Sequence, residues 1–186
     1  MNIALIIAGV NEALGPGKRL CIWTSGCLKH CYNCATPELQ ALDKIKDIDI
    51  IEKLKSMNLT GLDGVTISGG EPFLQMKELS SLVEFLSVKF DDILIYSGMT
   101  YESLKLLDGA NDIFSKISVL VDGEYIDELN QNEKLRGSTN QNILIFKEKY
   151  RLKYESYNKL PRKQEIFQID GKIFGVGLKN KEKNYE

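Results

Sequence analysis

The sequence has almost no net charge and no hydrophobic run long enough to cross a membrane. Its 186 residues include 24 basic and 26 acidic side chains, a formal net charge of −2, so it lacks the basic surplus with which proteins bind phosphate backbones. The apolar run at residues 3–10 has no basic residue before it and is far shorter than the ~20 residues that span a bilayer. We therefore expect a cytoplasmic protein that binds neither nucleic acid nor a membrane.

Cysteine and proline are also scarce, with four residues of each. A chain of this size with 43% hydrophobic residues can bury a core without disulfides, and no export signal points to an oxidising compartment. Three of the cysteines nevertheless lie close together, at Cys27, Cys31 and Cys34, in the spacing C-x3-C-x2-C. Three neighbouring thiols in a reducing compartment suggest a metal site.

The length of the chain limits the fold, because a complete eight-fold β/α barrel usually needs ~250 residues. Short β-branched runs alternate with helical patterns, which indicates β/α units and a parallel sheet in a single domain. The expected strands are residues 20–24, 64–68, 92–97, 117–122 and 143–146, with an additional edge strand at residues 2–8. The expected helices are residues 47–57, 76–89 and 100–107.

A glycine-rich loop at residues 11–18 precedes the first of the parallel strands. Its Gly15-Pro16-Gly17 run resembles part of a phosphate-binding loop, but that motif requires a glycine where the chain has Glu12 and a Ser or Thr where it has Arg19. Nucleotide triphosphate binding is therefore not predicted here.

The composition becomes polar after residue 147, which predicts a connector. Asp170-Gly171, between two runs rich in isoleucine, then predicts a two-residue β-hairpin. We expect this hairpin to extend a sheet edge or to cover one end of the core, followed by a charged, frayed tail. The predicted organisation is a main domain at residues 1–154 and a connector, hairpin and tail at residues 155–186, packed on the same domain.

The cysteine loop follows the strand expected at residues 20–24, which is where β/α proteins place their active sites. Iron–sulfur cubanes take cysteine thiolates as ligands, and three thiolates leave one iron of a [4Fe-4S] cluster open for a reaction. A zinc site with His30 as a fourth ligand, and thiols without any metal, are the alternatives. Cys21 alternates with apolar residues and is expected to be a small buried hydrophobe.

A second motif, Ser68-Gly69-Gly70-Glu71-Pro72, follows the next expected strand. The two glycines allow a ligand to approach the backbone closely, and Glu71 offers an acceptor for an ammonium group. An ordinary turn between a strand and a helix, with Glu71 in the first helical turn, is the alternative explanation.

Together the two motifs resemble the radical S-adenosylmethionine superfamily. The ordered segments of the chain are similar to the small activases of glycyl radical enzymes, and among these to the activating proteins of anaerobic ribonucleotide reductases. The segments are GPGKR, IWTSGC, SGGEPF, YSGMTYESL, VDGEYIDEL and LRGSTNQNIL. The resemblance covers residues 15–146 and implies an α/β fold of the radical S-adenosylmethionine type, a partial (β/α) barrel, here with a C-terminal β-hairpin.

The resemblance also implies ligands for two cofactors. Three irons of a [4Fe-4S] cluster would be bound by Cys27, Cys31 and Cys34, and the fourth iron would chelate the amino and carboxylate groups of S-adenosyl-L-methionine. The residues implied in binding that second cofactor are Asn33, Ser68, Gly69, Gly70, Glu71, Ser97, Asp122 and Arg136.

Each of these residues has its own implied role. Glu71 and the glycines before it would receive the methionine ammonium, and Asn33 would contact the adenine through its backbone. Ser97 and Asp122, at the ends of two expected strands, would hold the methionine or the ribose. Arg136, in a loop similar to the RGS loop of the family, would frame the cofactor or the partner. Related lyase activases have a lysine where this chain has Glu124.

The implied reaction is activation of a partner glycyl radical enzyme. An external one-electron donor such as flavodoxin or ferredoxin would reduce the cluster, S-adenosylmethionine would be cleaved, and the resulting radical would take a hydrogen atom from a glycine of the partner. Two alternatives remain open. One is a radical enzyme that modifies a peptide or a small molecule, because the smallest reductase activases do not need the hairpin; the other is a zinc-binding module without catalysis.

Overall fold

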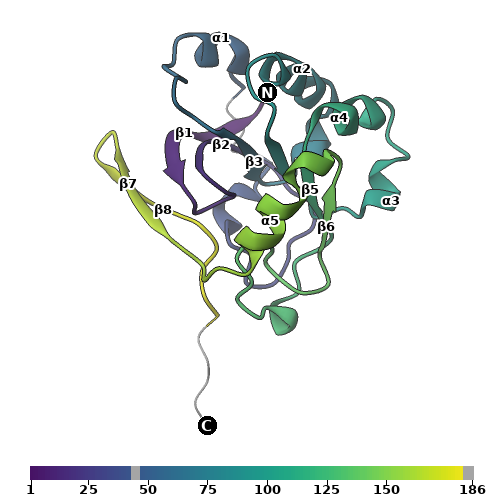
Figure 1. Cartoon of the computed structure of the whole chain (residues 1–186). Coiled ribbons are helices and arrows are strands. Elements are labelled where there is room, and N and C mark those ends of the chain that lie inside the picture. The colour runs from purple at the N-terminus through teal and green to yellow at the C-terminus, as the bar shows by residue number, and fades with distance from the viewer. Residues whose placement is uncertain (43–46, 182–186) are drawn as a thin grey trace.

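The computed structural model describes residues 1–42 and 47–181, and six strands within them form one sheet in the order β1-β2-β3-β4-β5-β6 (Figure 1). β2 to β5 run parallel, whereas β1 and β6 pair antiparallel at the two edges. The strands are β1 (Ile3–Asn11), β2 (Lys18–Thr24), β3 (Gly64–Gly69), β4 (Ile93–Tyr96), β5 (Val119–Asp122) and β6 (Asn142–Ile145). The expected α/β fold with a mainly parallel sheet is confirmed.

The edge strand β6 differs from the expectation of a parallel strand at residues 143–146. A parallel return needs a crossover of a dozen or more residues, usually a helix. The described connection between β5 and β6 holds only a 3-10 turn at Asp127–Leu129, and β6 pairs antiparallel with β5.

Four helices in the described residues lie between successive strands of this sheet: α1 (Ile50–Lys55), α2 (Met76–Ser87), α3 (Tyr101–Leu104) and α4 (Ala110–Lys116). The first three lie within the expected helices at residues 47–57, 76–89 and 100–107, and α4 was not predicted. α1 begins later than expected because the Asp49 carboxylate accepts a hydrogen bond from the Glu52 N–H at 3.0 Å and so caps the helix. None of the described helices has the length and hydrophobicity needed to cross a membrane.

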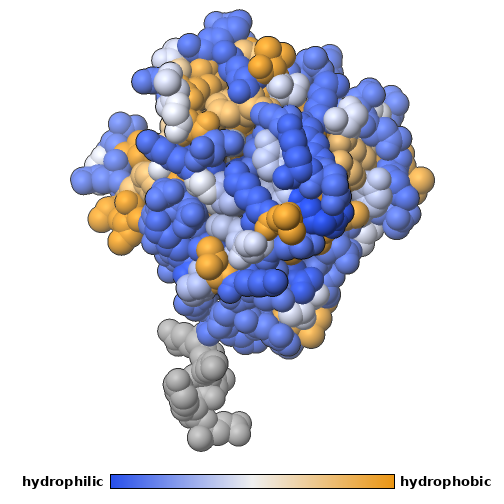
Figure 2. Space-filling model, viewed as in Figure 1, coloured by the Kyte–Doolittle hydropathy of each residue, from blue (hydrophilic) through white to orange (hydrophobic). Residues whose placement is uncertain are grey.

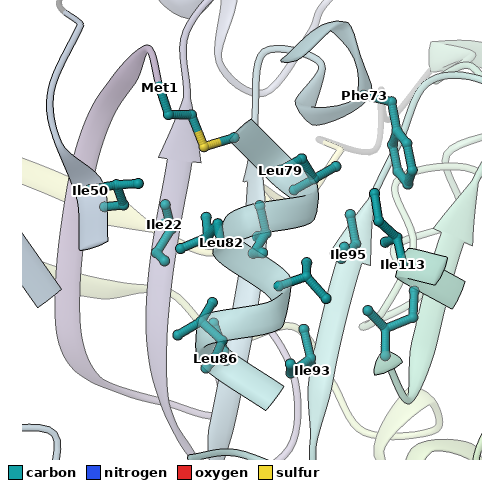
Figure 3. Close-up of a cluster of buried hydrophobic side chains, with 14 of the residues drawn as sticks. Met1, Ile22, Ile50, Phe73, Leu79, Leu82, Leu86, Ile93, Ile95 and Ile113 are labelled. Atoms are coloured by element: carbon teal, nitrogen blue, oxygen red, sulfur yellow. The ribbon is translucent and has the colours of Figure 1, made fainter. Parts of the chain in front are cut away.

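One face of the sheet is covered by α1, α2 and α4, and the main core lies between these layers (Figure 3). Leu79, Leu82 and Leu86 of α2 are fully buried, since residues three and four apart on a helix share one face. They belong to the same buried cluster as strand residues on this face of the sheet, such as Ile22 of β2 and Ile93 of β4.

The opposite face is covered by a helix that the sequence did not predict. Residues after 147 were expected to be a connector, but α5 (Arg151–Asn158) forms there and buries Tyr154 and Tyr157 against the face that carries Leu94 and Val121. Its polar composition hides the pattern, because the two buried residues are tyrosines whose hydroxyl groups find hydrogen-bond partners. The predicted boundary between residues 154 and 155 lies inside this helix.

The predicted hairpin is present as β7 (Glu165–Ile169) and β8 (Lys172–Val176), with positive φ at both turn residues, Asp170 and Gly171. It forms a separate two-stranded sheet and does not extend the main one. Val176 is buried in a cluster with Ile7 and Val10 of β1, so the hairpin covers that part of the core. Its outer side shows exposed apolar atoms, at the left of Figure 2.

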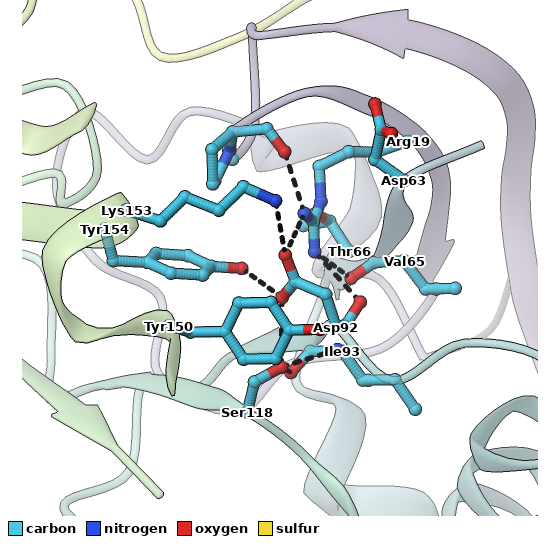
Figure 4. Close-up of polar contacts among 12 residues, drawn as sticks. Arg19, Asp63, Val65, Thr66, Asp92, Ile93, Ser118, Tyr150, Lys153 and Tyr154 are labelled. Carbon is cyan, nitrogen blue, oxygen red and sulfur yellow. Dashed lines mark hydrogen bonds and ion pairs between the residues drawn. The ribbon is translucent and has the colours of Figure 1, made fainter. Parts of the chain in front are cut away.

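A buried ion pair lies at the amino ends of the parallel strands, where α5 packs on the sheet (Figure 4). The Arg19 guanidinium lies 3.1 Å from the Asp92 carboxylate, and it donates to Thr66 and to the carbonyls of Pro16 and Val65. The Tyr154 hydroxyl of α5 donates to the same Asp92 carboxylate at 2.7 Å. The GPGKR segment is therefore a structural element in which the arginine holds the loop on the sheet.

Candidate functional site

A cavity of about 590 Å³ lies at the carboxyl ends of the parallel strands, at the opposite end from Arg19. Its wall combines the cysteine loop after β2 with residues that follow β3, β4 and β5, together with Arg162 and residues 178–181 from the C-terminal region. The volume is within the range of small-molecule and cofactor sites. This is the edge at which open α/β sheets place their ligands.

All three cysteines of the loop line this cavity, and each is a free, partly buried thiol. The Lys29 N–H donates to the Cys27 Sγ at 3.4 Å, and the Cys31 Sγ lies 3.9 Å from the Glu124 carboxylate. Burial raises the pKa of Cys27 and of Cys31. Since a bound cation favours the thiolate and releases the proton, binding of a metal by these thiols would depend on pH.

The donor set suits an iron–sulfur cluster. In the described residues, no three His, Cys, Asp or Glu side chains converge on one metal ion. A cubane does not need this convergence, since each thiolate binds a different iron. The fourth cysteine, Cys21, lies in β2 within a hydrophobic cluster, where burial raises its pKa to about 12. His30, which we considered as a zinc ligand, is exposed and contacts Gln40 at 3.4 Å.

The two glycines of the second motif hold the cysteine loop against β3. The Gly70 N–H donates to the Thr24 carbonyl at 2.9 Å, and the next N–H, of Glu71, donates to the Gly26 carbonyl at 2.8 Å. A Cβ atom added to Gly70 would lie 2.2 Å from the Gly26 oxygen, and one on Gly69 would lie 2.3 Å from the Thr24 oxygen. Glycine is required because two backbones meet there, in addition to any approach by a ligand.

Glu71 lines the cavity, although its side chain is almost completely buried. It accepts hydrogen bonds from the Phe73 N–H at 3.1 Å, the Ser97 hydroxyl at 3.0 Å and the Gly98 N–H at 2.8 Å. Burial raises the pKa of Glu71, although these hydrogen bonds favour its ionised form. The expected site residues Asn33, Ser68, Gly69, Gly70 and Ser97 line the same cavity.

Two of the expected residues are not among the described residues that line the cavity. The Asp122 carboxylate accepts hydrogen bonds from the Tyr101 N–H and, at 2.8 Å, from the Asn142 side chain, so it fixes the start of α3 and the start of β6. The Arg136 guanidinium pairs with Glu133 and donates to the Gln141 carbonyl at 2.6 Å. Arg136 thus contacts a cavity-lining residue, Gln141, whereas the hydrogen-bond partners of Asp122 do not line the cavity.

Several cavity residues were missed by the sequence analysis. Tyr125, Asp127 and Asn130 come from the connection after β5, and Arg162 comes from the segment between α5 and β7. Residues 179–181, expected to fray, form part of the wall; residues 182–186 lie outside the described part. Tyr125 and Asp127 lie in the segment VDGEYIDEL, which carried the resemblance without giving either residue a role. Asn130 and Arg162 lie outside the quoted segments, and only the path of the chain brings them to the cavity.

Three thiols on one loop and a glycine-rich turn meet at one cavity at the strand ends, so the chain is an α/β protein whose cavity has the donors for a thiolate-bound metal cofactor. The family model described as "4Fe-4S single cluster domain" matches residues 13–144, most of the chain, and the chain belongs to this family.

Individual proteins that are similar to the chain have more specific names than the family model. The anaerobic ribonucleoside-triphosphate reductase-activating protein of Vibrio cholerae is 33% identical over 145 residues, 71% of this chain and 90% of that protein. The protein of the same name from Enterobacteria phage T4 is 26% identical over 141 residues, 69% of this chain and 85% of that protein. The pyruvate formate-lyase-activating enzyme of Staphylococcus epidermidis is 28% identical over 148 residues, 73% of this chain and 57% of that enzyme. The resemblance to activases of glycyl radical enzymes is confirmed.

Proposed function

We propose that the chain is a radical S-adenosylmethionine activase, which cleaves S-adenosylmethionine at a [4Fe-4S] cluster and abstracts a hydrogen atom from a glycine of a partner glycyl radical enzyme. Anaerobic ribonucleotide reductase is the partner we favour, because the relatives include its activating proteins. The main observation behind the proposal is that Cys27, Cys31, Cys34 and Glu71 line one cavity. The mainly parallel sheet would then be the partial (β/α) barrel expected of this superfamily.

The cofactors would carry out the electron transfer and the bond cleavage. One electron from the reduced cluster would break a carbon–sulfur bond of the sulfonium, giving methionine and a 5′-deoxyadenosyl radical that takes a hydrogen atom from the glycine α-carbon. The protein contributes three thiolates as iron ligands. Three thiolates would leave one iron without a protein ligand, and this iron would be available to the methionine amino and carboxylate groups.

The second motif would orient the methionine. The Glu71 carboxylate, fixed by three hydrogen bonds, lies in the cavity wall where it can accept a hydrogen bond from the ammonium group. Ser97 positions that carboxylate and lines the cavity itself. Asn33 is exposed and has φ of +51°, and its backbone would contact the adenine.

Electrons would come from an external one-electron donor such as flavodoxin or ferredoxin. We place the reaction in the cytoplasm, because the cluster thiols must stay reduced.

The cluster assignment is tested with Cys31→Ala, prepared without air. We expect loss of the iron–sulfur absorption and loss of reductive S-adenosylmethionine cleavage. Cys21→Ala is the matched control, since that thiol is buried outside the cavity, and it should retain both. If Cys31→Ala retains iron, sulfide and cleavage, the assignment is wrong; if the purified chain holds only zinc, a zinc-binding module is correct.

The partner is tested by mixing reduced protein, S-adenosylmethionine and anaerobic ribonucleotide reductase. A glycine-centred radical signal in electron paramagnetic resonance is expected. Cofactor cleavage without that signal would instead favour a peptide or a small molecule as substrate.

A further inference from the structure

The C-terminal strap, defined here as residues 177–181, forms one side of the cavity. It leaves the hairpin after the buried Val176, turns at Gly177, which has φ of +117°, and then lines the cavity from Leu178 to Lys181. In Figure 1 it runs down from the hairpin, below the sheet. The strap lies beyond the family match, which ends at residue 144, so it is an addition to the shared domain at the site of its chemistry.

Asn132 binds the backbone of the strap in the way a neighbouring peptide strand would. Its Oδ1 accepts the Lys181 N–H at 2.6 Å, and its Nδ2 donates to the Lys181 carbonyl at 3.3 Å. One side-chain amide thus satisfies both backbone groups of one residue. The Lys181 ammonium adds a contact with the Asp127 carbonyl at 2.6 Å.

Arg162 completes this arrangement. Its Nη1 donates to the Lys179 carbonyl of the strap and lies 3.4 Å from the Asn132 side-chain oxygen. Its other nitrogens donate to backbone carbonyls of the RGS loop region, those of Glu133, Arg136 and Gly137, at 2.9 to 3.2 Å. Because the guanidinium is held on several sides, the donor for Lys179 and the acceptor for Lys181 have fixed positions.

These contacts recognise a peptide by its main chain. Main-chain hydrogen bonds supply affinity for extended peptides in other proteins, and a glycine offers nothing but main-chain groups near its α-carbon. The strap is held mainly by polar contacts of partly exposed groups, which open at low free energy compared with a packed core. A second peptide can therefore compete for the same donors and acceptors.

We propose that Asn132 and Arg162 form a peptide-binding subsite that the chain's own strap occupies, and that the glycine-bearing segment of the protein substrate binds there in place of the strap. This rests on the proposed function for the identity of the substrate. The strap is then an internal competitor, which covers the cavity until the substrate replaces it.

The subsite is tested with a fluorescent peptide of residues 177–186, GLKNKEKNYE. A variant that ends at Gly177 lacks the strap, and a variant that ends at Lys181 is the matched control that keeps it. We expect saturable binding of the peptide to the first variant, measured by fluorescence anisotropy, and at least about tenfold weaker binding to the second, because its own strap fills the subsite. Asn132→Ala in the shorter variant should weaken binding about tenfold.

A pair of full-length variants protects the test against misfolding of the shortened chain. Lys181→Pro removes the backbone N–H that donates a hydrogen bond to Asn132, whereas Lys181→Ala keeps this N–H. Lys181→Pro should bind the peptide more tightly than Lys181→Ala. No binding to the variant that ends at Gly177, or equal binding to all of these proteins, would overturn the subsite.

The substrate part of the proposal needs a second peptide, spanning the radical glycine of an anaerobic ribonucleotide reductase. Displacement of the fluorescent peptide by it supports the proposal. No displacement, in a protein that activates that reductase, overturns the substrate part. Failure of the proposed function would be seen separately as absence of S-adenosylmethionine cleavage, a measurement that does not involve the peptide.

Discussion

Asp92 shows how one buried charge organises this protein. Its side chain is 1% exposed and accepts hydrogen bonds from Arg19, Ser118 and Tyr154, with the Lys153 ammonium at 3.2 Å. Burial alone would raise the pKa of this carboxyl, but the Arg19 charge and the hydrogen bonds lower it overall. The carboxylate is thus stable only because its partners are present.

The lowered pKa of Asp92 predicts a pH dependence of folding stability. The stabilisation is present above the unfolded-state pKa, about 3.9, and is lost as the pH falls through the lower folded-state value. Asp92→Asn leaves the buried Arg19 charge unpaired, and it should lower the free energy of unfolding at pH 7 by about 3–5 kcal/mol. The difference from the wild type should shrink as the pH falls below about 4.

Urea unfolding at several pH values measures this difference, and Asp108→Asn, at an exposed aspartate, is the control. A difference that stays constant down to pH 2 would contradict the argument.

At the scale of secondary structure, α5 is the largest difference from the fold expected from the sequence. Through Tyr154 it joins the Arg19–Asp92 pair, and through Tyr157 it reaches the loop before β2. The Tyr157 hydroxyl accepts the Gly15 N–H at 3.0 Å and donates to the Glu12 carbonyl at 2.8 Å. A region expected to be a connector therefore fixes the loop that carries Arg19.

Tyr157→Phe removes that hydroxyl and leaves the Gly15 N–H without its partner in a buried position. We expect the free energy of unfolding to fall by about 1–3 kcal/mol. Tyr32→Phe serves for comparison, because the Tyr32 side chain is 74% exposed. Equal unfolding midpoints for the two variants would show that the α5 contact does not hold the loop.

At the scale of the whole molecule, the cavity exists because loops from separate strands meet above the sheet. The closest meeting is between the glycine motif after β3 and the cysteine loop after β2, where backbone contacts backbone. The position of the three thiols thus depends on the second motif as well as on their own loop.

Gly70→Ala should separate these two loops. Its Cβ would lie 2.2 Å from the Gly26 oxygen, so we expect a loss of about 1–3 kcal/mol in the free energy of unfolding and a lower iron content after reconstitution. Gly175→Ala is the matched control, because nothing lies within 4 Å of a Cβ at that position. A Gly70→Ala protein that binds iron like the control would contradict the proposed coupling.

Much of the fold followed from local patterns. The parallel strands, the hairpin turn at Asp170-Gly171 and helix α2 all reflect side-chain periodicity or turn chemistry that neighbouring residues determine. Helix α5 did not follow, because its buried side chains are tyrosines that depend on partners such as Asp92, far away in the sequence.

The candidate site also contains residues that local patterns predict and residues that only the fold places there. The cysteine spacing and the glycine motif are local, so the sequence alone predicts both. Asp122 directly precedes the cavity residue Gly123, but its carboxylate binds the starts of α3 and β6. Arg162 is far along the chain from the cysteine and glycine motifs, but it forms part of the cavity wall.

The sequence alone shows the three closely spaced thiols and the two adjacent glycines, since thiol spacing and backbone freedom are properties of short segments. Which groups face the cavity, and that the chain's own C-terminal strap lines one side of it, could be read from the three-dimensional arrangement alone. Such placement depends on contacts between residues distant along the chain, and no local pattern records the free energy of those contacts.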